Sequence, residues 1–349
     1  MKKLALFLSV LFAVSAFTGC SGGSDTGGGS SSDQGGGAAE NSSDTVNIVV
    51  TDNGWDSQML HNEIARLVVE HAYDGYTFET STASSTINWQ SLIKGEIDLD
   101  IESWTENVNS YQEDLANGDV VELGVLVPDG QQGVYVPRYV IEGDPERDIE
   151  PMAPELKSVE DLKKYPDVFP DDEEPEKGRL FGAIPGWMAD EILEKKYHYY
   201  ALDETFEYRR LGSEASLFSS LESAYNLGQA WAGYCYEPSW IAGRLDIVKL
   251  EDAPYEYEKY INGQCEYPSQ ELMVVSSGEF AQRAPELVEF FESYETGSEL
   301  ISSALSYLDE THASHEEVAV WLLKENDELI DQWLPGENAE KLRDYLAEL

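Results

Sequence analysis

The segment VNIVVTDNGWDSQMLHNEIARLVVEH, residues 46–71, sets the fold class because it contains a strand, a turn and a helix in succession. Residues 46–50 predict a first strand, and residues 51–54 end it with Thr-Asp-Asn-Gly. Apolar residues then recur at helical spacing from Leu60 to Val68, with Asp56 or Ser57 as the expected N-cap. A strand that leads through a glycine turn into a helix is the start of a β-α-β unit.

The same alternation continues along the next thirty positions. Residues 76–80 predict a second strand, residues 87–93 a helix that ends at Gly95, and residues 97–101 a third strand. This order predicts an α/β sheet whose ligand groups lie at the ends of the strands.

The chain then leaves this sheet, builds a second one and returns. We expect strands at residues 120–127 and 133–140 to cross into a second domain and a strand at 271–276 to lead back. Amphipathic helices fill residues 285–349, and the acidic run at 171–176 is expected to be a solvated loop. The prediction is a two-lobed, type II periplasmic-binding-protein fold with a ligand cleft between the lobes. Lobe 1 would comprise residues 45–138 and 270–349, and lobe 2 residues 139–269.

The first 44 residues indicate an exported and anchored protein. Residues 1–20 have a basic start, a short apolar run and small residues before Cys20, which is typical of a secretory signal. A cysteine directly after Gly19 resembles the bacterial lipobox, which implies lipidation of Cys20. Residues 21–44 are almost wholly small and polar, as in a flexible tether. We therefore expect an extracytoplasmic protein held to the cell membrane by a lipid.

Composition excludes one class of partner. The chain has 68 acidic and 22 basic residues and a net charge of −46. Nucleic acid is excluded, because binding it requires a basic surface. The strongly acidic surface of this chain repels itself unless salt screens the charge, which indicates adaptation to a saline environment. Beyond Cys20, Cys235 and Cys265 remain, and the sequence leaves open whether they form a disulfide or are two buried thiols.

Aromatic residues lie where a cleft at the strand ends would need them. Trp55 follows the first strand, Trp104 follows the third, Trp187 lies in a Pro-Gly-Trp turn, and Tyr236 lies in a buried segment. A quaternary ammonium has no N–H to donate, but the faces of tryptophan and tyrosine rings attract it. These four residues therefore predict an aromatic box for a permanent cation.

These segments resemble the substrate-binding proteins of glycine betaine and related quaternary-amine ABC transporters, over nearly all of residues 46–335. The resemblance is carried by NGWDS (53–57), GEIDLDIESW (95–104), IPGW (184–187) and GYCYEPSW (233–240). It implies an aromatic box of Trp55, Trp104 and Tyr236, with Trp187 as a fourth wall.

The resemblance also implies how the rest of the ligand is held. The ligand carboxylate would be bound by Gly186, Met188 and Asn109. Asp56 would accept a hydrogen bond from a ligand hydroxyl or compensate the cation, unless it is only a helix cap. The implied partners are a membrane permease and its ATPase, the implied state is a monomer, and no cofactor is expected.

Three other interpretations remain open. Choline or carnitine would fit the same fold in place of glycine betaine. A secreted glycan hydrolase would need paired carboxylates, for which Asp100, Glu102, Glu106 and Glu237 are available, but no G-x-S-x-G motif within residues 45–349 and no H-E-x-x-H motif supports catalysis. An amino-acid ligand would need an arginine clamp, and the arginines at positions 138, 179, 209 and 210 lie outside the aromatic segments. We expect no metal site, and place His312 and His315 on the surface.

Overall fold

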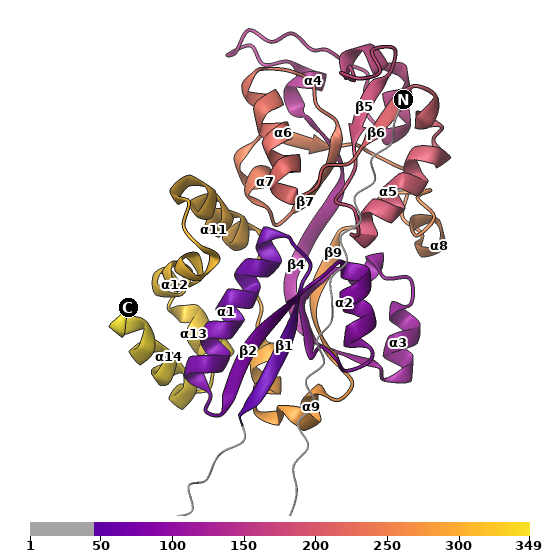
Figure 1. The fold of residues 1–349 in the computed structure, drawn as a ribbon. Coiled ribbons are helices and arrows are strands. Elements are labelled where there is room, and N and C mark those ends of the chain that lie inside the picture. The colour runs from indigo at the N-terminus through magenta and orange to yellow at the C-terminus, as the bar shows by residue number, and fades with distance from the viewer. Residues whose placement is uncertain (1–44) are drawn as a thin grey trace, which may run out of the picture. The chain divides into compact units, whose positions relative to one another are not determined.

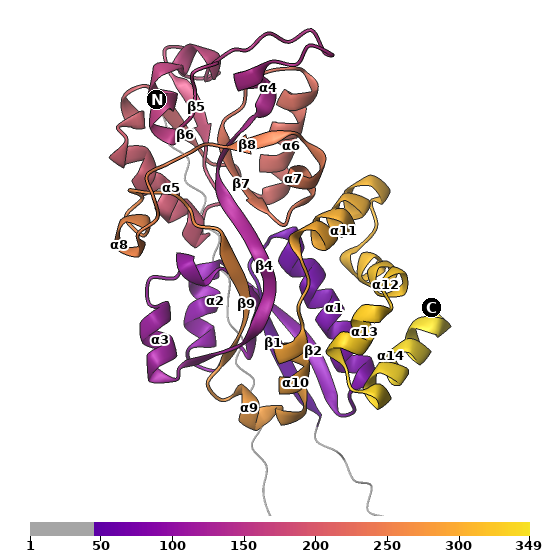
Figure 2. The ribbon, with the colours of Figure 1, turned by 180° about the vertical axis from the view of Figure 1, so that it is seen from behind.

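The computed structural model describes residues 45–349 of the 349-residue chain (Figures 1 and 2). The predicted signal segment, Cys20 and the glycine-rich tether lie outside the described residues. None of the described helices combines the length and apolar character needed to cross a membrane.

Nine strands in residues 45–349 are hydrogen-bonded in the order β2-β1-β3-β9-β4-β7-β5-β6, and β8 pairs with β4. β1 is parallel to β2 and β3, and β5 is parallel to β6 and β7, whereas β4 and β9 are antiparallel to their neighbours. The predicted α/β class is therefore confirmed. The strands are β1 (Val46–Asp52), β2 (Tyr76–Thr82), β3 (Leu99–Ser103), β4 (Val120–Pro137), β5 (Gly178–Phe181), β6 (Phe206–Arg209), β7 (Gly233–Glu237), β8 (Ile247–Lys249) and β9 (Gln270–Ser277).

Helices flank the strands of both halves. Helix α1 and the C-terminal helices lie on one side of β1 and β2, and α2 and α3 lie on the other side (Figures 1 and 2). The α-helices are α1 (Asp56–Ala72), α2 (Ser85–Leu92), α3 (Tyr111–Asn117), α4 (Arg138–Glu142), α5 (Met188–Tyr199), α6 (Glu214–Asn226), α7 (Trp240–Arg244), α8 (Tyr257–Tyr260), α9 (Phe280–Arg283), α10 (Val288–Ser293), α11 (Ser298–Thr311), α12 (His315–Glu325), α13 (Glu328–Trp333) and α14 (Gly336–Glu348).

Strand β4 connects the two halves of the sheet. Its first part pairs with β9, and residues 131–137 pair with β7 and β8. The prediction of two separate strands here was wrong, because the backbone continues through Pro128 to Gly130 with shifts of register instead of a turn. The strands β1–β3 and β5–β7 thus form the centres of two lobes joined by β4 and β9. The lobe limits at residues 138/139 and 269/270 stay a prediction.

The first strand and helix follow the predicted pattern. Ile48 and Val50 are fully buried, and so are Leu60, Ile64 and Leu67 on one face of α1. The predicted cap was one or two residues late: Trp55 is the N-cap, and Asp56 is the first helical residue. The shift matters because it places an indole, rather than a carboxylate, where the chain turns from β1 into α1.

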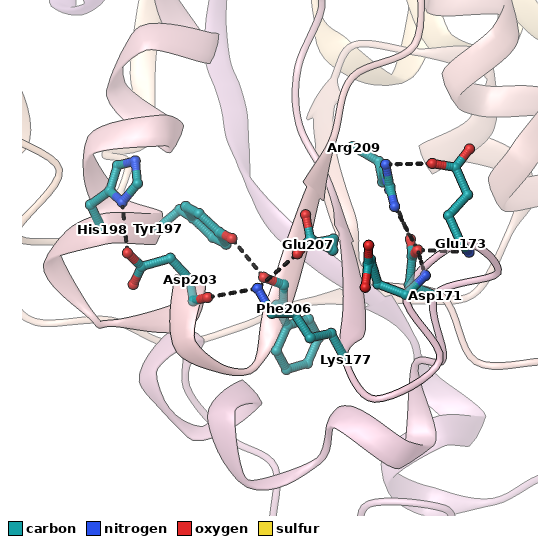
Figure 3. A network of polar contacts seen from close by, with 10 residues as sticks. Asp171, Glu173, Lys177, Tyr197, His198, Asp203, Phe206, Glu207 and Arg209 are labelled. Carbon is teal, nitrogen blue, oxygen red and sulfur yellow. Dashed lines mark hydrogen bonds and ion pairs between the residues drawn. The ribbon is translucent and has the colours of Figure 1, made fainter.

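The acidic run at residues 171–176 is not merely a solvated loop. The Asp171 side chain is buried and accepts hydrogen bonds from Arg209 Nε and Nη2 at 2.9 and 2.7 Å (Figure 3). Its Oδ1 also accepts the backbone N–H groups of Glu173 and Glu174. These donors hold the pKa of Asp171 well below its usual range. Asp171 therefore anchors the loop to β6.

The aromatic residues of the C-terminal helices pack as predicted. Trp333 is buried, and its Nε1 donates to the Glu295 carbonyl oxygen at 3.1 Å. Trp321 is partly buried and stacks on Tyr307 with ring centroids 4.2 Å apart. Both residues stabilise the helical layer beside α1.

Candidate functional site

Four predicted box residues come from four separate places in the chain and meet at one cavity. Trp55 follows β1, Trp104 follows β3, Trp187 is the N-cap of α5, and Tyr236 lies in β7. All four line the same cavity. Trp55 and Trp104 lie at the carboxyl ends of neighbouring parallel strands, where α/β sheets bind ligands.

The rings of these residues stand nearly perpendicular to one another. Trp55 and Trp187 have centroids 5.3 Å apart at 86°, and Trp104 and Tyr236 are 5.8 Å apart at 89°. Trp187 and Tyr236 complete the set at 6.0 Å and 80°. Edge-to-face packing fixes each ring against its neighbour. The rings therefore form adjoining walls rather than a flat stack.

The cavity between these walls is largely apolar with a few polar groups. It contains about 480 Å³ of space free of protein atoms, part of which is open to solvent. Further residues that line it are Asn53, Ser85, Asp100, Ser103, Asn107 and Tyr234. No lysine, arginine or histidine of the described residues lines it.

Contacts between the two lobes close one side of this cavity. Trp187 Nε1 donates to the Asn53 carbonyl oxygen at 3.0 Å, and the Met188 backbone N–H donates to Ser85 Oγ at 3.2 Å. Gly186 has a positive φ of 94°, and a Cβ there would lie 2.9 Å from Ser84 Cβ. The Pro-Gly-Trp turn therefore requires glycine both for its backbone conformation and for its close approach to the first lobe.

A buried carboxyl group holds two of the indoles. Oε1 of Glu102 accepts hydrogen bonds from Trp55 Nε1, Trp104 Nε1 and Ser57 Oγ, each at 3.0 Å. Glu102 is 0% exposed, and its Oε2 has no hydrogen-bond partner within the described residues. Burial raises the pKa of Glu102 to about 8, against the opposing effect of the three donors.

The second lobe supplies a similar group behind Tyr236. Glu214 Oε2 accepts a hydrogen bond from Tyr236 Oη at 2.8 Å and from the Asp56 backbone N–H at 3.2 Å. Burial, together with the negative charges of Asp56 and Glu102, raises the pKa of Glu214 well above its usual value. Glu214 therefore links the Tyr236 wall to the start of α1 in the other lobe.

One carboxyl group lines the cavity itself. Asp100 accepts hydrogen bonds from Thr51 Oγ1 at 2.8 Å and Gln58 Nε2 at 2.9 Å. Burial raises the pKa of Asp100 to about 6, although these donors favour the ionised form. The cavity thus has an acidic wall and no basic one among the residues described, which suits a cation.

The structure separates the weaker sequence candidates. Met188 lines the cavity, but its N–H already donates to Ser85. Gly186 shapes the turn and does not line the cavity. Asn109 is exposed and lies outside the cavity, so the structure does not support its predicted position. Asp56 also lies outside, and its Oδ1 is 3.2 Å from His315 Nε2.

Sequence reasoning did not assign most of the polar residues of the cavity to the ligand site, and Asn107 and Tyr234 are two examples. Asn107, two positions before Asn109, is buried and lines it, and its Oδ1 accepts a hydrogen bond from Gln132 Nε2 at 2.9 Å. Tyr234 lies two residues before Tyr236 on the same face of β7 and donates to Gln132 Oε1 at 3.0 Å. The alternation of side chains along a strand would have pointed to Tyr234.

The two cysteines are free thiols, which is the second of the alternatives that the sequence left open. Cys235 lies in β7 and Cys265 in the segment before β9, and both are buried. The possible disulfide between Cys235 and Cys265 is therefore not formed. Burial raises the pKa of the Cys235 thiol above its usual value.

No group of three or more histidine, cysteine or acidic side chains within residues 45–349 is arranged to hold a metal ion. The surface position predicted for His312 is confirmed, whereas His315 is only partly exposed. The chemistry of the site is therefore that of its rings and carboxyl groups. Several ring faces attract a cation at roughly 0.5–2 kcal/mol each.

Comparisons with known proteins identify the family and the fold of the chain. The family model described as the substrate binding domain of ABC-type glycine betaine transport system matches residues 46–325. The glycine betaine-binding periplasmic protein OusX of Dickeya dadantii (strain 3937) is 21% identical over 235 residues, which cover 62% of this chain and 67% of that protein.

Two solved structures share the fold. The glycine betaine/L-proline-binding protein ProX of Borrelia burgdorferi has a TM-score of 0.67 and 21% identity, covering 85% of this chain and 99% of that one. An ABC-transporter choline-binding protein in complex with choline has a TM-score of 0.67 and 15% identity, covering 86% and 98%. At this identity the likeness shows the fold alone, which is the two-lobed fold of periplasmic binding proteins.

Proposed function

The chain belongs to the family of substrate-binding domains of ABC-type glycine betaine transport systems, and on this premise we propose that it captures a small quaternary-ammonium osmolyte, glycine betaine first of all, for an ABC importer. One observation carries the proposal: Trp55, Trp104, Trp187 and Tyr236 enclose a single cavity with their rings nearly perpendicular. The ring faces would bind the trimethylammonium group, and its methyl groups would lose contact with water.

The carboxylate of glycine betaine would need neutral donors. No basic side chain of the described residues lines the cavity, but the hydroxyl group of Ser103 does, whereas the Ser85 hydroxyl already donates to the Gly186 carbonyl oxygen. Ser103 Oγ is buried near the Asp100 carboxyl group, whose pKa it lowers, but it makes no well-formed hydrogen bond in the part of the chain that the structure describes. A ligand carboxylate that accepts a hydrogen bond from it would remove the cost of that unpaired group.

Choline is the second candidate, and Asp100 favours it. The Asp100 carboxyl group lines the cavity, so the hydroxyl group of a ligand can donate to it, whereas a ligand carboxylate next to it would be repelled. Carnitine carries both a hydroxyl and a carboxylate, and it would be subject to both effects.

The test is a titration of the purified protein followed by tryptophan fluorescence and calorimetry. We expect glycine betaine or choline to saturate the site at micromolar concentration, and the order of the two affinities identifies the preferred substrate. Dimethylglycine, which lacks one methyl group, is the matched control ligand and should bind more weakly. If neither quaternary amine binds to correctly folded protein, the proposal is wrong.

We further propose that Cys20 carries a lipid that holds the protein at the outer face of the cell membrane. The composition of residues 1–44 supports this, because a tether follows the cysteine directly. Replacement of Cys20 by alanine should release the protein from the membrane fraction. Unchanged fractionation of the Cys20→Ala variant would contradict the anchor. We expect the protein to act as a monomer with its permease and ATPase.

A further inference from the structure

The tryptophans that line the cavity donate to two kinds of acceptor: Trp187 bonds the neutral Asn53 carbonyl oxygen, whereas Trp89, Trp55 and Trp104 bond carboxyl groups. Trp55 and Trp104 line the cavity, and their indole N–H groups share one carboxyl oxygen of Glu102. Trp231 and Trp333 lie away from the cavity, and their N–H groups donate to the neutral oxygens Ser220 Oγ and Glu295 O. A neutral acceptor therefore suffices to orient an indole in this fold.

A buried carboxyl group is an expensive acceptor for the same purpose. Glu102 is 0% exposed, and its second oxygen has no partner within the described residues. Removing a carboxylate from water costs far more than burying an amide or a carbonyl group. Packing alone does not explain why this position carries an acid, so we looked for what its charge would do.

The surroundings of Glu102 contain no opposite charge. Several titratable groups either shift the pKa of Glu102 or have their own pKa shifted by it, and none of them is a lysine or an arginine. His61 on α1 contacts Tyr294, and burial lowers its pKa to about 3, so it is neutral. The other groups are Asp100 on β3, Glu214 on α6, Tyr234 and Tyr236 on β7, and Tyr294 after α10.

We propose that Glu102 is the positioning residue of the aromatic box and its buried counter-charge, which ionises when a permanent cation enters the cavity. This inference rests on the proposed function. In the empty site Glu102 is largely protonated. When the cation binds against the faces of Trp55 and Trp104, the Glu102 O–H bond breaks and the proton passes to bulk water. The ligand itself is unchanged.

The distances make this coupling strong. A cation lies within about 6 Å of the centroid of a ring that binds it. Each of the two rings is attached through its N–H to Glu102. The cation and the carboxylate would therefore be separated by roughly 7 Å. At an effective dielectric constant of about 20, this attraction corresponds to roughly tenfold to a hundredfold in affinity.

Two measurable consequences follow from the pKa of about 8 in the empty site. Binding at pH 7 should release up to about 0.9 of a proton, because about nine tenths of Glu102 is protonated at that pH. The dissociation constant should fall by up to about tenfold per pH unit as pH rises toward 8, and it should level off above that.

The experiment is calorimetric titration of the wild-type protein with glycine betaine and with choline, at constant ionic strength. Titrations at pH 7 in phosphate and in Tris, whose ionisation enthalpies differ, give the number of protons released. Titrations from pH 6 to pH 9 give the pH profile. We expect release of about half a proton or more and an affinity that rises with pH.

The variant Glu102→Gln keeps an acceptor oxygen for the indoles and removes the charge. We expect it to bind about 10- to 100-fold more weakly at pH 8, with less proton release at pH 7 and a flatter pH profile than the wild-type protein, because Asp100 still titrates in the cavity. Glu122→Gln is the control, because Glu122 accepts a hydrogen bond from Tyr111 outside the cavity. It should keep the wild-type profile.

The possible failures are distinguishable. Binding of either probe without proton release by the wild-type protein overturns the role of Glu102 and leaves the proposed function standing. The same holds if Glu102→Gln keeps the wild-type pH profile. Absence of binding by both probes overturns the proposed function and this inference with it. If Glu102→Gln does not fold, the proton count of the wild-type protein still decides.

Discussion

Truncation of Trp104 to alanine should weaken binding of the preferred quaternary amine by about 10- to 150-fold. The side chain is 9% exposed and is held by Glu102 at 3.0 Å and by the perpendicular Tyr236 ring. Loss of one ring face removes about 0.5–2 kcal/mol of cation–π attraction. Loss of about 40 Å² of apolar contact removes about 1 kcal/mol more. The sum is about 1.5–3 kcal/mol, which gives the stated range.

The assay is calorimetric titration, with chemical unfolding measured alongside. Trp104→Ala also removes packing, so its unfolding free energy should fall by about 3–5 kcal/mol. For that reason Trp104→Phe, which keeps an aromatic face but is smaller and lacks the N–H, is the second variant and should bind less than about tenfold more weakly. Trp321→Ala is the control, because Trp321 in α12 stacks on Tyr307 in α11 and its loss should leave affinity unchanged. An unchanged dissociation constant for a folded Trp104→Ala protein would refute the aromatic box.

Three further predictions concern closure, pH and salt. The variant Trp187→Phe lacks the N–H that donates to the Asn53 carbonyl oxygen between the lobes, so its affinity for the ligand, measured by titration, should fall about 3- to 10-fold. The control variant Trp231→Phe loses an N–H that donates to Ser220 away from the cavity, and its affinity should not change. In the folded protein the pKa of Glu102 is raised to about 8 and that of Asp100 to about 6, so both groups bind more protons in the folded state than in the unfolded state. The melting temperature of the ligand-free protein should therefore fall as the pH rises from about 4.5 to 8, and it should fall less steeply in the Glu102→Gln variant. With a net charge of −46, raising sodium chloride from about 0.05 to 1 M should raise the melting temperature by more than about 5 °C, and a flat response would contradict self-repulsion.

The elements of the fold were predictable where local pattern decides them. The strand at residues 46–50 and the apolar face of α1 follow from periodicity, because the same residues are buried in the structure. Strand β4 could not be predicted as one continuous strand, because Pro128-Asp129-Gly130 has the composition of a turn. Its partners β7, β8 and β9 keep the backbone extended, and they lie about 100 residues or more away in the sequence. Such tertiary pairing cannot be obtained from a short window of sequence.

The aromatic walls of the site were predictable because each one stands at the end of a strand or at a helix start. Asn109 was misplaced for a local reason. After Trp104 the chain forms the short 3-10 helix η1 (Thr105–Asn107), which turns Asn107 inward and leaves Asn109 exposed. A shift of two residues is enough to move a side chain out of a cavity.

The acids behind the rings were hidden by the composition itself. Among 68 acidic residues, a carboxylate near a tryptophan is expected by chance, so the sequence could not distinguish Glu102 from Asp100, Glu106 or Glu237. Its three donors come from β3 and from the start of α1, and only the parallel pairing of β1 with β3 brings them together. Most acids of this chain are exposed to water, where salt screens their charge. The field of a carboxylate that is 0% exposed is screened much less, so it acts on a cation in the cavity even in concentrated salt. Charge can therefore contribute to the binding of a cation in concentrated salt only if it comes from a buried acid.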